Sequence, residues 1–167
     1  GRGPAVPLDG PALYCGLYLT ELLVRMLHRD DAQEGLLSLY QHTLEGLVST
    51  QEPVDIALRR FEYRLLDQLG YGFSLDSDIN GQAIAPGARY HLLPDQGLML
   101  DLRGAFAGEL VLAVAAEDWQ PDSRRLARDL MRAALAPHLG DKPLRSRELF
   151  RHGSRANQLS EQNGEDV

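Results

Sequence analysis

Apolar residues recur at helical spacing in three segments of the first seventy residues. Between Leu13 and Leu27 they lie nearly all round the predicted helix, which favours a central, well-buried position. A second, amphipathic helix is predicted over residues 32–48. The third follows Pro53 and ends before Gly70, because glycine readily adopts the left-handed conformation that ends many helices. Its apolar face contains Leu58, Phe61, Leu65 and Leu69.

The pattern changes over residues 71–102, where turn-forming residues are closely spaced and apolar stretches are short. This composition predicts an irregular segment with one or two small hairpins. Helical spacing resumes over about residues 106–115, and a longer helix is predicted from Asp122 to Leu139, capped by Asp122 or a neighbour and ended by Gly140. The predicted fold is mainly α, a compact helical bundle with a small irregular or β-hairpin insertion.

The two ends of the chain differ from this helical part. Residues 1–11 contain three Gly and three Pro, which is typical of a linker, and we expect it to follow an upstream domain. Residues 12–152 are predicted to form the helical domain. Residues 153–167 are polar and are predicted to form a disordered tail.

Charge is distributed unevenly along the chain. Residues 122–155 contain nine of the seventeen Lys and Arg residues against four acidic residues, although the whole chain has a net charge of −7. On a helical wheel, four arginines share the face opposite the apolar one, and such a row can follow a phosphate backbone. The residues assigned to DNA by this interpretation are Arg124, Arg125, Arg128, Arg132, Lys142, Arg145, Arg147 and Arg151. The alternative is a solvated face paired with the protein's own acids, which the spacing alone favours.

The third predicted helix offers a different kind of site, because Arg59, Arg60 and Arg64 lie beside its Leu and Phe face. A cation beside an apolar groove suits a peptide that ends in an apolar residue and a carboxylate. The alternative, which the pattern alone favours, is that these arginines pair with nearby carboxylates such as Glu62, Asp55 or Asp67. The pattern leaves both possibilities open.

Catalytic and metal-binding patterns are weak. The five histidines are scattered without the spacing of a triad or a metal-ligand pair, and Gly87 stands where a calcium loop beginning at Asp76 needs a glutamate. Cys15 is the only cysteine, which favours a reducing compartment such as the cytoplasm. We therefore expect a protein that is not an enzyme, and a hydrolase with paired carboxylates is a distant alternative.

Four blocks of residues, in order and at similar spacing, resemble the C-terminal part of the bacterial recombination mediator family RecO. Together they cover about residues 12–151, and the last block is the most specific. The blocks are Leu13-Tyr14-Cys15-Gly16-Leu17-Tyr18-Leu19-Thr20-Glu21-Leu22-Leu23, Ala57-Leu58-Arg59-Arg60-Phe61-Glu62, Leu69-Gly70-Tyr71-Gly72 and Leu139-Gly140-Asp141-Lys142-Pro143-Leu144-Arg145-Ser146-Arg147-Glu148-Leu149-Phe150.

This resemblance implies a cytoplasmic, nucleoid-associated DNA repair and recombination protein without enzymatic activity. Such proteins bind single-stranded and double-stranded DNA, anneal strands and, with RecR, load recombinase onto DNA covered by the single-stranded-DNA-binding protein SSB. Their helical domain receives the acidic, Phe-ending tail of SSB. The residues carried over to that tail are Arg59, Arg60, Phe61 and Tyr63. A helical domain that docks partners without contacting DNA is the alternative function.

The chain departs from the family pattern in two respects. Many members hold a four-cysteine zinc site after the Gly-Tyr-Gly turn, whereas residues 74–81 contain no cysteine, so we expect no zinc and no other cofactor. An OB-fold domain precedes the helical domain in the family, and we expect this chain to represent only the helical part. Without that domain, strand annealing by this chain is expected to be weak.

Overall fold

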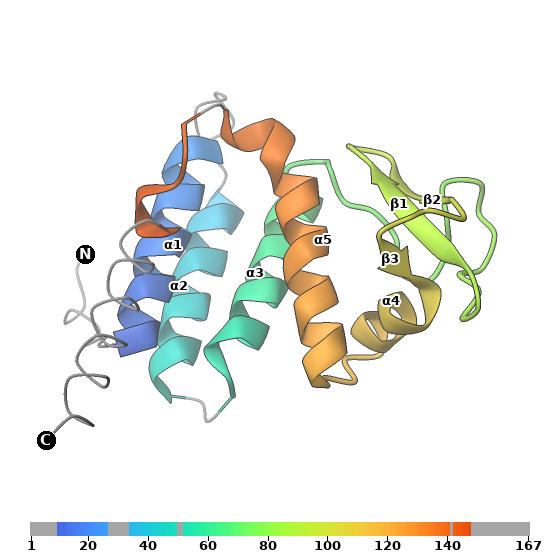
Figure 1. The fold of residues 1–167 in the computed structure, drawn as a ribbon. Helices are drawn as coiled ribbons and strands as arrows, with labels where there is room; N and C mark the ends of the chain where they lie inside the picture. The colour runs from blue at the N-terminus through green and yellow to red at the C-terminus, as the bar shows by residue number, and fades with distance from the viewer. Residues whose placement is uncertain (1–9, 27–33, 50–51, 141, 148–167) are drawn as a thin grey trace, which may run out of the picture.

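The computed structural model describes residues 10–26, 34–49, 52–140 and 142–147, and within these ranges the protein is mainly helical (Figure 1). Helices α1 (Gly10–Met26), α2 (Glu34–Ser49) and α3 (Val54–Gln68) confirm the three helices expected in the first half. The predicted tail at 153–167 and most of the predicted linker at 1–11 lie outside the described residues.

Helix α5 (Pro121–Leu139) joins the two parts of the fold, because it packs against α1 and α3 on one side and against α4 (Gly108–Ala115) on the other (Figure 1). Its first turn is capped by a capping box, in which the Gln120 side chain accepts the Ser123 backbone N–H and the Ser123 hydroxyl accepts the Gln120 backbone N–H over 2.8 Å. Pro137 lies within its last turn, and Gly140 follows with a φ of 74°. The predicted bounds of this helix are therefore confirmed, with Gln120 as the cap.

The insertion forms a small antiparallel sheet of order β2-β1-β3. Strands β1 (Arg89–Leu93) and β2 (Gly97–Leu100) make the expected hairpin, and β3 (Phe106–Ala107) pairs with the other edge of β1. The prediction that helical structure resumes at residue 106 is wrong by two residues. The Gly108 N–H donates to Ala88 O over 2.8 Å, and this contact holds the first residue of α4 beside the start of β1.

The buried core is continuous from the helices to the sheet. Its fully buried side chains include Leu19, Leu22, Leu36, Phe61, Leu65, Leu130, Leu135, Val111, Tyr90 and Leu98.

The prediction of a well-buried α1 is confirmed for one face of the helix and wrong for another. Leu13, Leu17 and Val24 are 43%, 42% and 58% exposed, whereas Leu19 and Leu22 are fully buried. The three exposed residues are spaced by four and seven positions, so they share one stripe of the helix. A helix that packs through one face buries only part of its apolar surface, whatever the composition of the other face.

Candidate functional site

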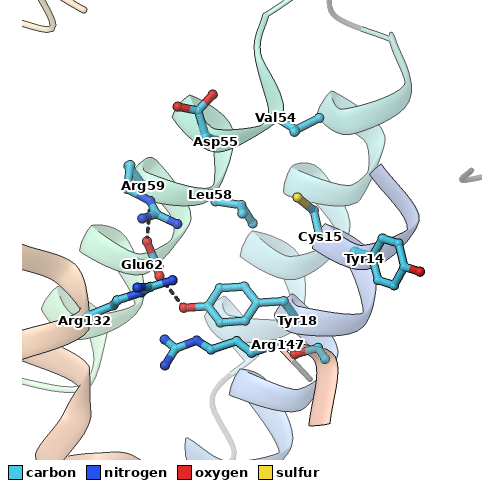
Figure 2. A pocket seen from close by; sticks show the side chains of 11 residues that line it. Tyr14, Cys15, Tyr18, Val54, Asp55, Leu58, Arg59, Glu62, Arg132 and Arg147 are labelled. Carbon is cyan, nitrogen blue, oxygen red and sulfur yellow. Dashed lines mark hydrogen bonds and ion pairs between the residues drawn. The ribbon is translucent and has the colours of Figure 1, made fainter. Parts of the chain in front are cut away.

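A cavity of about 240 Å³ opens between α1, α3, α5 and the segment that follows α5 (Figure 2). Apolar and aromatic side chains form much of its wall, and the guanidinium groups of Arg59, Arg132 and Arg147 come to it from three separate parts of the chain. The other lining residues are Tyr14, Cys15, Tyr18, Val54, Asp55, Leu58, Glu62 and Ser146. We call this space the arginine-lined cavity.

Glu62 is the fully buried acid at this cavity. Tyr18 donates its hydroxyl hydrogen bond to Glu62 Oε2, and Arg59 Nε lies 2.8 Å from Oε1 (Figure 2). The Arg59 contact is an ion pair without hydrogen-bond geometry, so both of its atoms lack a hydrogen-bond partner among the described residues. Burial raises the pKa of Glu62, against the opposing effects of Arg59, Tyr18, Arg147 and Arg132.

The other two arginines of the cavity have no such partner. Within the described ranges, neither Arg132 nor Arg147 forms an ion pair with a carboxylate. Burial lowers the pKa of Arg132, and the charges of Arg147, Arg128 and Arg59 lower it further. The Arg147 guanidinium carbon lies 5.7 Å from the centre of the Tyr18 ring, which is a cation–π distance. The cavity therefore combines apolar walls with an excess of positive charge.

Residues 142–147, which we call the clip, place Arg147 at the cavity by crossing back to α1 (Figure 1). Arg25 donates hydrogen bonds to the carbonyl oxygens of Leu139 (3.0 Å), Lys142 (2.5 Å) and Pro143 (2.8 Å). The first of these bonds holds the end of α5, and the other two attach the start of the clip to α1. Arg25 also lies 3.4 Å from Glu21, which holds the other end of the clip.

Glu21 binds the end of the clip that reaches the cavity. Its carboxylate accepts the Arg145 N–H (2.9 Å), the Ser146 N–H (3.0 Å) and the Ser146 hydroxyl (2.8 Å). Burial raises the pKa of Glu21, but these hydrogen bonds and Arg25 outweigh it and the pKa is lowered overall. Leu144, 3% exposed, anchors the clip in the core. The clip, which is part of the most specific sequence block, is thus held on α1 by the side chains of Glu21 and Arg25.

Of the residues predicted to bind DNA, three on α5 are paired internally. Arg124 makes two hydrogen bonds to Asp55, of 2.8 and 2.6 Å, while Arg125 pairs with Asp122 and Arg128 with Asp129. Arg132 and Arg147 lie at the arginine-lined cavity instead, and the side chains of Lys142 and Arg145 are exposed. Arg151 lies outside the described residues.

The residues predicted for the SSB tail are divided between several environments. Arg59 lines the arginine-lined cavity and also a second cavity, of about 270 Å³ between α3, α4 and α5, whose wall includes Arg60 and Tyr63. Arg60 is held by Glu52 (2.5 Å) and Glu117 (2.6 Å). Phe61 is 1% exposed and packs in the core, so it stabilises the packing of α3 and is not accessible to a partner.

Sequence reasoning missed how the cavity is assembled. It anticipated the Arg59–Glu62 pair, but it missed Tyr18 as a partner of Glu62 and assigned Arg132 and Arg147 to a different site from Arg59. One signal was available: Glu21 and Arg25 are charged residues four apart on an otherwise apolar helix, a position that suggests a specific contact.

Cys15 also lines the cavity, and burial raises the pKa of its thiol to about 11. The thiol is therefore protonated and weakly reactive at neutral pH.

None of the helices in the described ranges has the length and apolar character needed to cross a membrane.

Comparison with known proteins gives the family. The sequence profile of the family described as "Recombination protein O C terminal" matches residues 7–148. The chain is 51% identical over 152 residues to "DNA repair protein RecO" of Stutzerimonas stutzeri, covering 89% of this chain and 64% of that protein. It is 50% identical over 147 residues to the protein of that name from Pseudomonas aeruginosa PAO1, covering 86% of this chain and 63% of the relative.

A third relative, "DNA repair protein RecO" of Pseudomonas putida GB-1, is 47% identical over 153 residues, which cover 89% of this chain and 67% of that protein. The chain thus spans about two thirds of the length of these curated relatives. It belongs to the family of RecO C-terminal domains.

Proposed function

We propose that this domain is a binding part of a bacterial DNA repair and recombination mediator, and that its arginine-lined cavity receives the acidic, Phe-ending tail of SSB. The observation that carries the proposal is the convergence of Arg59, Arg132 and Arg147 on one apolar cavity. An aromatic side chain with a free carboxylate supplies what this cavity lacks, an apolar group for its walls and an anion for its guanidinium groups.

The acidic residues that precede the terminal Phe have a counterpart beside the cavity. A neighbouring hollow lined by Arg124, Arg125 and Arg128 shares Arg59 and Asp55 with the arginine-lined cavity. An acidic peptide leaving the cavity along α5 would meet these arginines, whose own ion pairs are exposed and can exchange partners. Affinity is therefore concentrated at the cavity, and the hollow contributes mainly to long-range attraction.

Calorimetric titration with a synthetic acidic, Phe-ending peptide tests this function. Arg132→Ala should weaken binding by about 1–3 kcal/mol, the usual effect of losing a charge-assisted contact. Arg103→Ala is the matched control, an exposed arginine that lines neither the cavity nor the hollow, and it should leave the affinity unchanged. Arg59→Ala is expected to weaken binding by a similar amount, but it also removes the partner of buried Glu62, so its folding must be checked.

Two results would contradict the proposed site. Unchanged affinity in a folded Arg132→Ala variant would exclude this guanidinium as an anchor. Equal binding of the same peptide with a C-terminal amide would show that the free carboxylate is not recognised, and the three arginines would then have another role.

For the whole mediator we propose DNA binding, strand annealing, and recombinase loading with RecR, without enzymatic activity. In this domain the support for direct DNA contact is weaker, because three predicted contacts are already paired with Asp55, Asp122 and Asp129. That pairing favours the second candidate function, a partner-docking domain with little DNA affinity of its own. Fluorescence titration with single-stranded DNA at several salt concentrations separates the two.

A further inference from the structure

We propose that the clip, residues 142–147, is a detachable wall of the arginine-lined cavity, and that its docking on α1 and the binding of an anion in the cavity strengthen each other. Glu21 and Arg25 are then positioning residues: they touch no ligand but set the affinity of the cavity. For the SSB tail this inference rests on the proposed function, whereas the coupling itself can be measured with simple anions.

The clip is attached through few side chains, which makes it separable from the rest of the fold. It follows Gly140, where α5 has ended, and among the described residues its polar attachments are two hydrogen bonds from Arg25 and the three accepted by Glu21. Both side chains are 18% exposed, so water can replace these bonds when the clip leaves. Leu144 is its buried apolar anchor. Segments with few buried apolar contacts open at less cost than the global unfolding free energy.

Docking the clip changes the chemistry of the cavity. Ser146 and Arg147 form part of its wall, so the docked clip completes the set of three guanidinium groups. It also brings Arg147 close enough to Arg132 to lower the pKa of Arg132, a sign of mutual repulsion. The cation–π contact with Tyr18 and the attraction of Glu62 act against this repulsion. The proposal requires that, without an anion, the repulsion between Arg132 and Arg147 still weakens the docking that Glu21 and Arg25 provide.

An anion reverses that balance. Bound between Arg132 and Arg147, a carboxylate or phosphate replaces repulsion by two attractions, and the docked clip gains stability. By linkage, whatever stabilises the docked clip must raise the affinity for the anion by the same factor. Loss of Glu21 should therefore weaken anion binding although Glu21 does not line the cavity.

The clip can be followed directly by amide hydrogen exchange. The N–H groups of Arg145 and Ser146 donate to Glu21, so their protection reports docking. Glu21→Ala should abolish this protection while the amides of α3 stay protected, which shows that the fold survives. Glu109→Ala, an exposed acid on α4, is the matched control and should leave the clip amides unchanged.

A second readout uses the only cysteine of the chain. Because Cys15 lines the cavity, its reaction with a thiol reagent should be faster by about tenfold or more in Glu21→Ala, the factor expected when about 1.4 kcal/mol of protection is lost. N-acetylphenylalanine, which carries one ring and one free carboxylate, should slow this reaction in the wild-type protein and also raise the protection of the clip amides. Inorganic phosphate tests the anion alone.

One variant distinguishes coupling between clip docking and anion binding from a purely structural role of the clip. Arg147→Met keeps an apolar contact with Tyr18 but removes the charge, so the clip amides should be better protected without anion and should no longer respond to it. Weaker protection in Arg147→Met, or unchanged anion affinity in Glu21→Ala, would overturn the coupling. If phosphate raises clip protection but N-acetylphenylalanine and the tail peptide do not bind, the coupling stands and the proposed tail site fails. If no anion alters the clip amides, the coupling is wrong.

Discussion

The two ends of the arginine row on α5 differ in what surrounds them. At the N-terminal end, Arg124, Arg125 and Arg128 each lie beside a carboxylate, and all three are exposed enough for water to screen them. At the other end, Arg132 meets two more arginines and the buried Glu62. The same residue type at regular spacing therefore forms an internally neutralised surface at one end and a charged cavity at the other.

This difference shows that a count of arginines does not give the charge available to a partner. The carboxylate that neutralises Arg124 comes from α3, and the guanidinium that accompanies Arg132 comes from the clip. Tertiary contacts therefore decide which arginines remain available to an anionic partner. The predictions below alter one end of the row and use the other as its control.

The largest effect is expected for Glu62→Ala. Truncation leaves the charge of Arg59 and the hydroxyl of Tyr18 without their buried partner, and breaking a buried pair in this way costs about 3–5 kcal/mol of unfolding free energy. Asp122→Ala, which removes the exposed partner of Arg125, should cost less than about 1 kcal/mol. Urea denaturation measures the unfolding free energy of both variants. Similar losses at the two positions would contradict the distinction between a charged cavity at one end of the row and an exposed, neutralised surface at the other.

The pH dependence of stability should have opposite signs for two carboxyls near the cavity. Glu62 has a raised pKa, so the folded state holds its proton to higher pH than the unfolded state does, and its contribution is lost as the pH rises through the folded pKa. Glu21 has a lowered pKa, so its contribution is present above the unfolded pKa and is lost as the pH falls through the folded one.

Two amide variants can separate these contributions. The cost of Glu21→Gln should shrink in acid, while the cost of Glu62→Gln should be largest there. Denaturation curves recorded across the acidic range compare the variants with the wild-type protein. A pH-independent cost at either position would contradict its assignment.

The fold was largely predictable because local signals agree with the tertiary structure. The apolar period of α3 and α5, with glycines at residues 70 and 140 that have φ values of 87° and 74°, is sufficient to locate those helices. The start of α4 was not predictable, because residues 106 and 107 pair with β1 and this long-range contact leaves no local signal. The exposed stripe of α1 was missed for a similar reason: composition does not show which face has a neighbour.

The site was predictable only in parts. A helical wheel places Arg132 on a face with Arg124, but it contains no information about Arg147 or Tyr18, which reach the same cavity from other elements. Arg59 was assigned to a binding site through the family resemblance, and the structure adds the arginines that accompany it. Spacing within one helix predicts a face, whereas a cavity depends on the packing of several.

Asp55→Asn should increase the affinity for the acidic tail peptide by about two- to fivefold, the range expected for one partly exposed charge. Asp55 lies between the two ends of the row: it pairs with Arg124 and also lines the cavity, so its charge opposes an anionic ligand. Calorimetry with Asp129→Asn as the control isolates the effect, because Asp129 does not line the cavity. Reduced affinity in Asp55→Asn would show that the Arg124 contact is needed to shape the site.

The smallest effect is expected at the neutralised end, for single-stranded DNA. Asp122→Asn releases Arg125 from its internal partner, so DNA affinity at low salt should rise slightly and the salt dependence should steepen by less than about one phosphate contact. Asp76→Asn, on the exposed surface of the insertion, is the charge-matched control. The wild-type protein could instead already show the steep salt dependence of several phosphate contacts, and Asp122→Asn could leave it unchanged. This result would mean that the paired arginines exchange their carboxylates for phosphates. The two ends of the row would then act on DNA together.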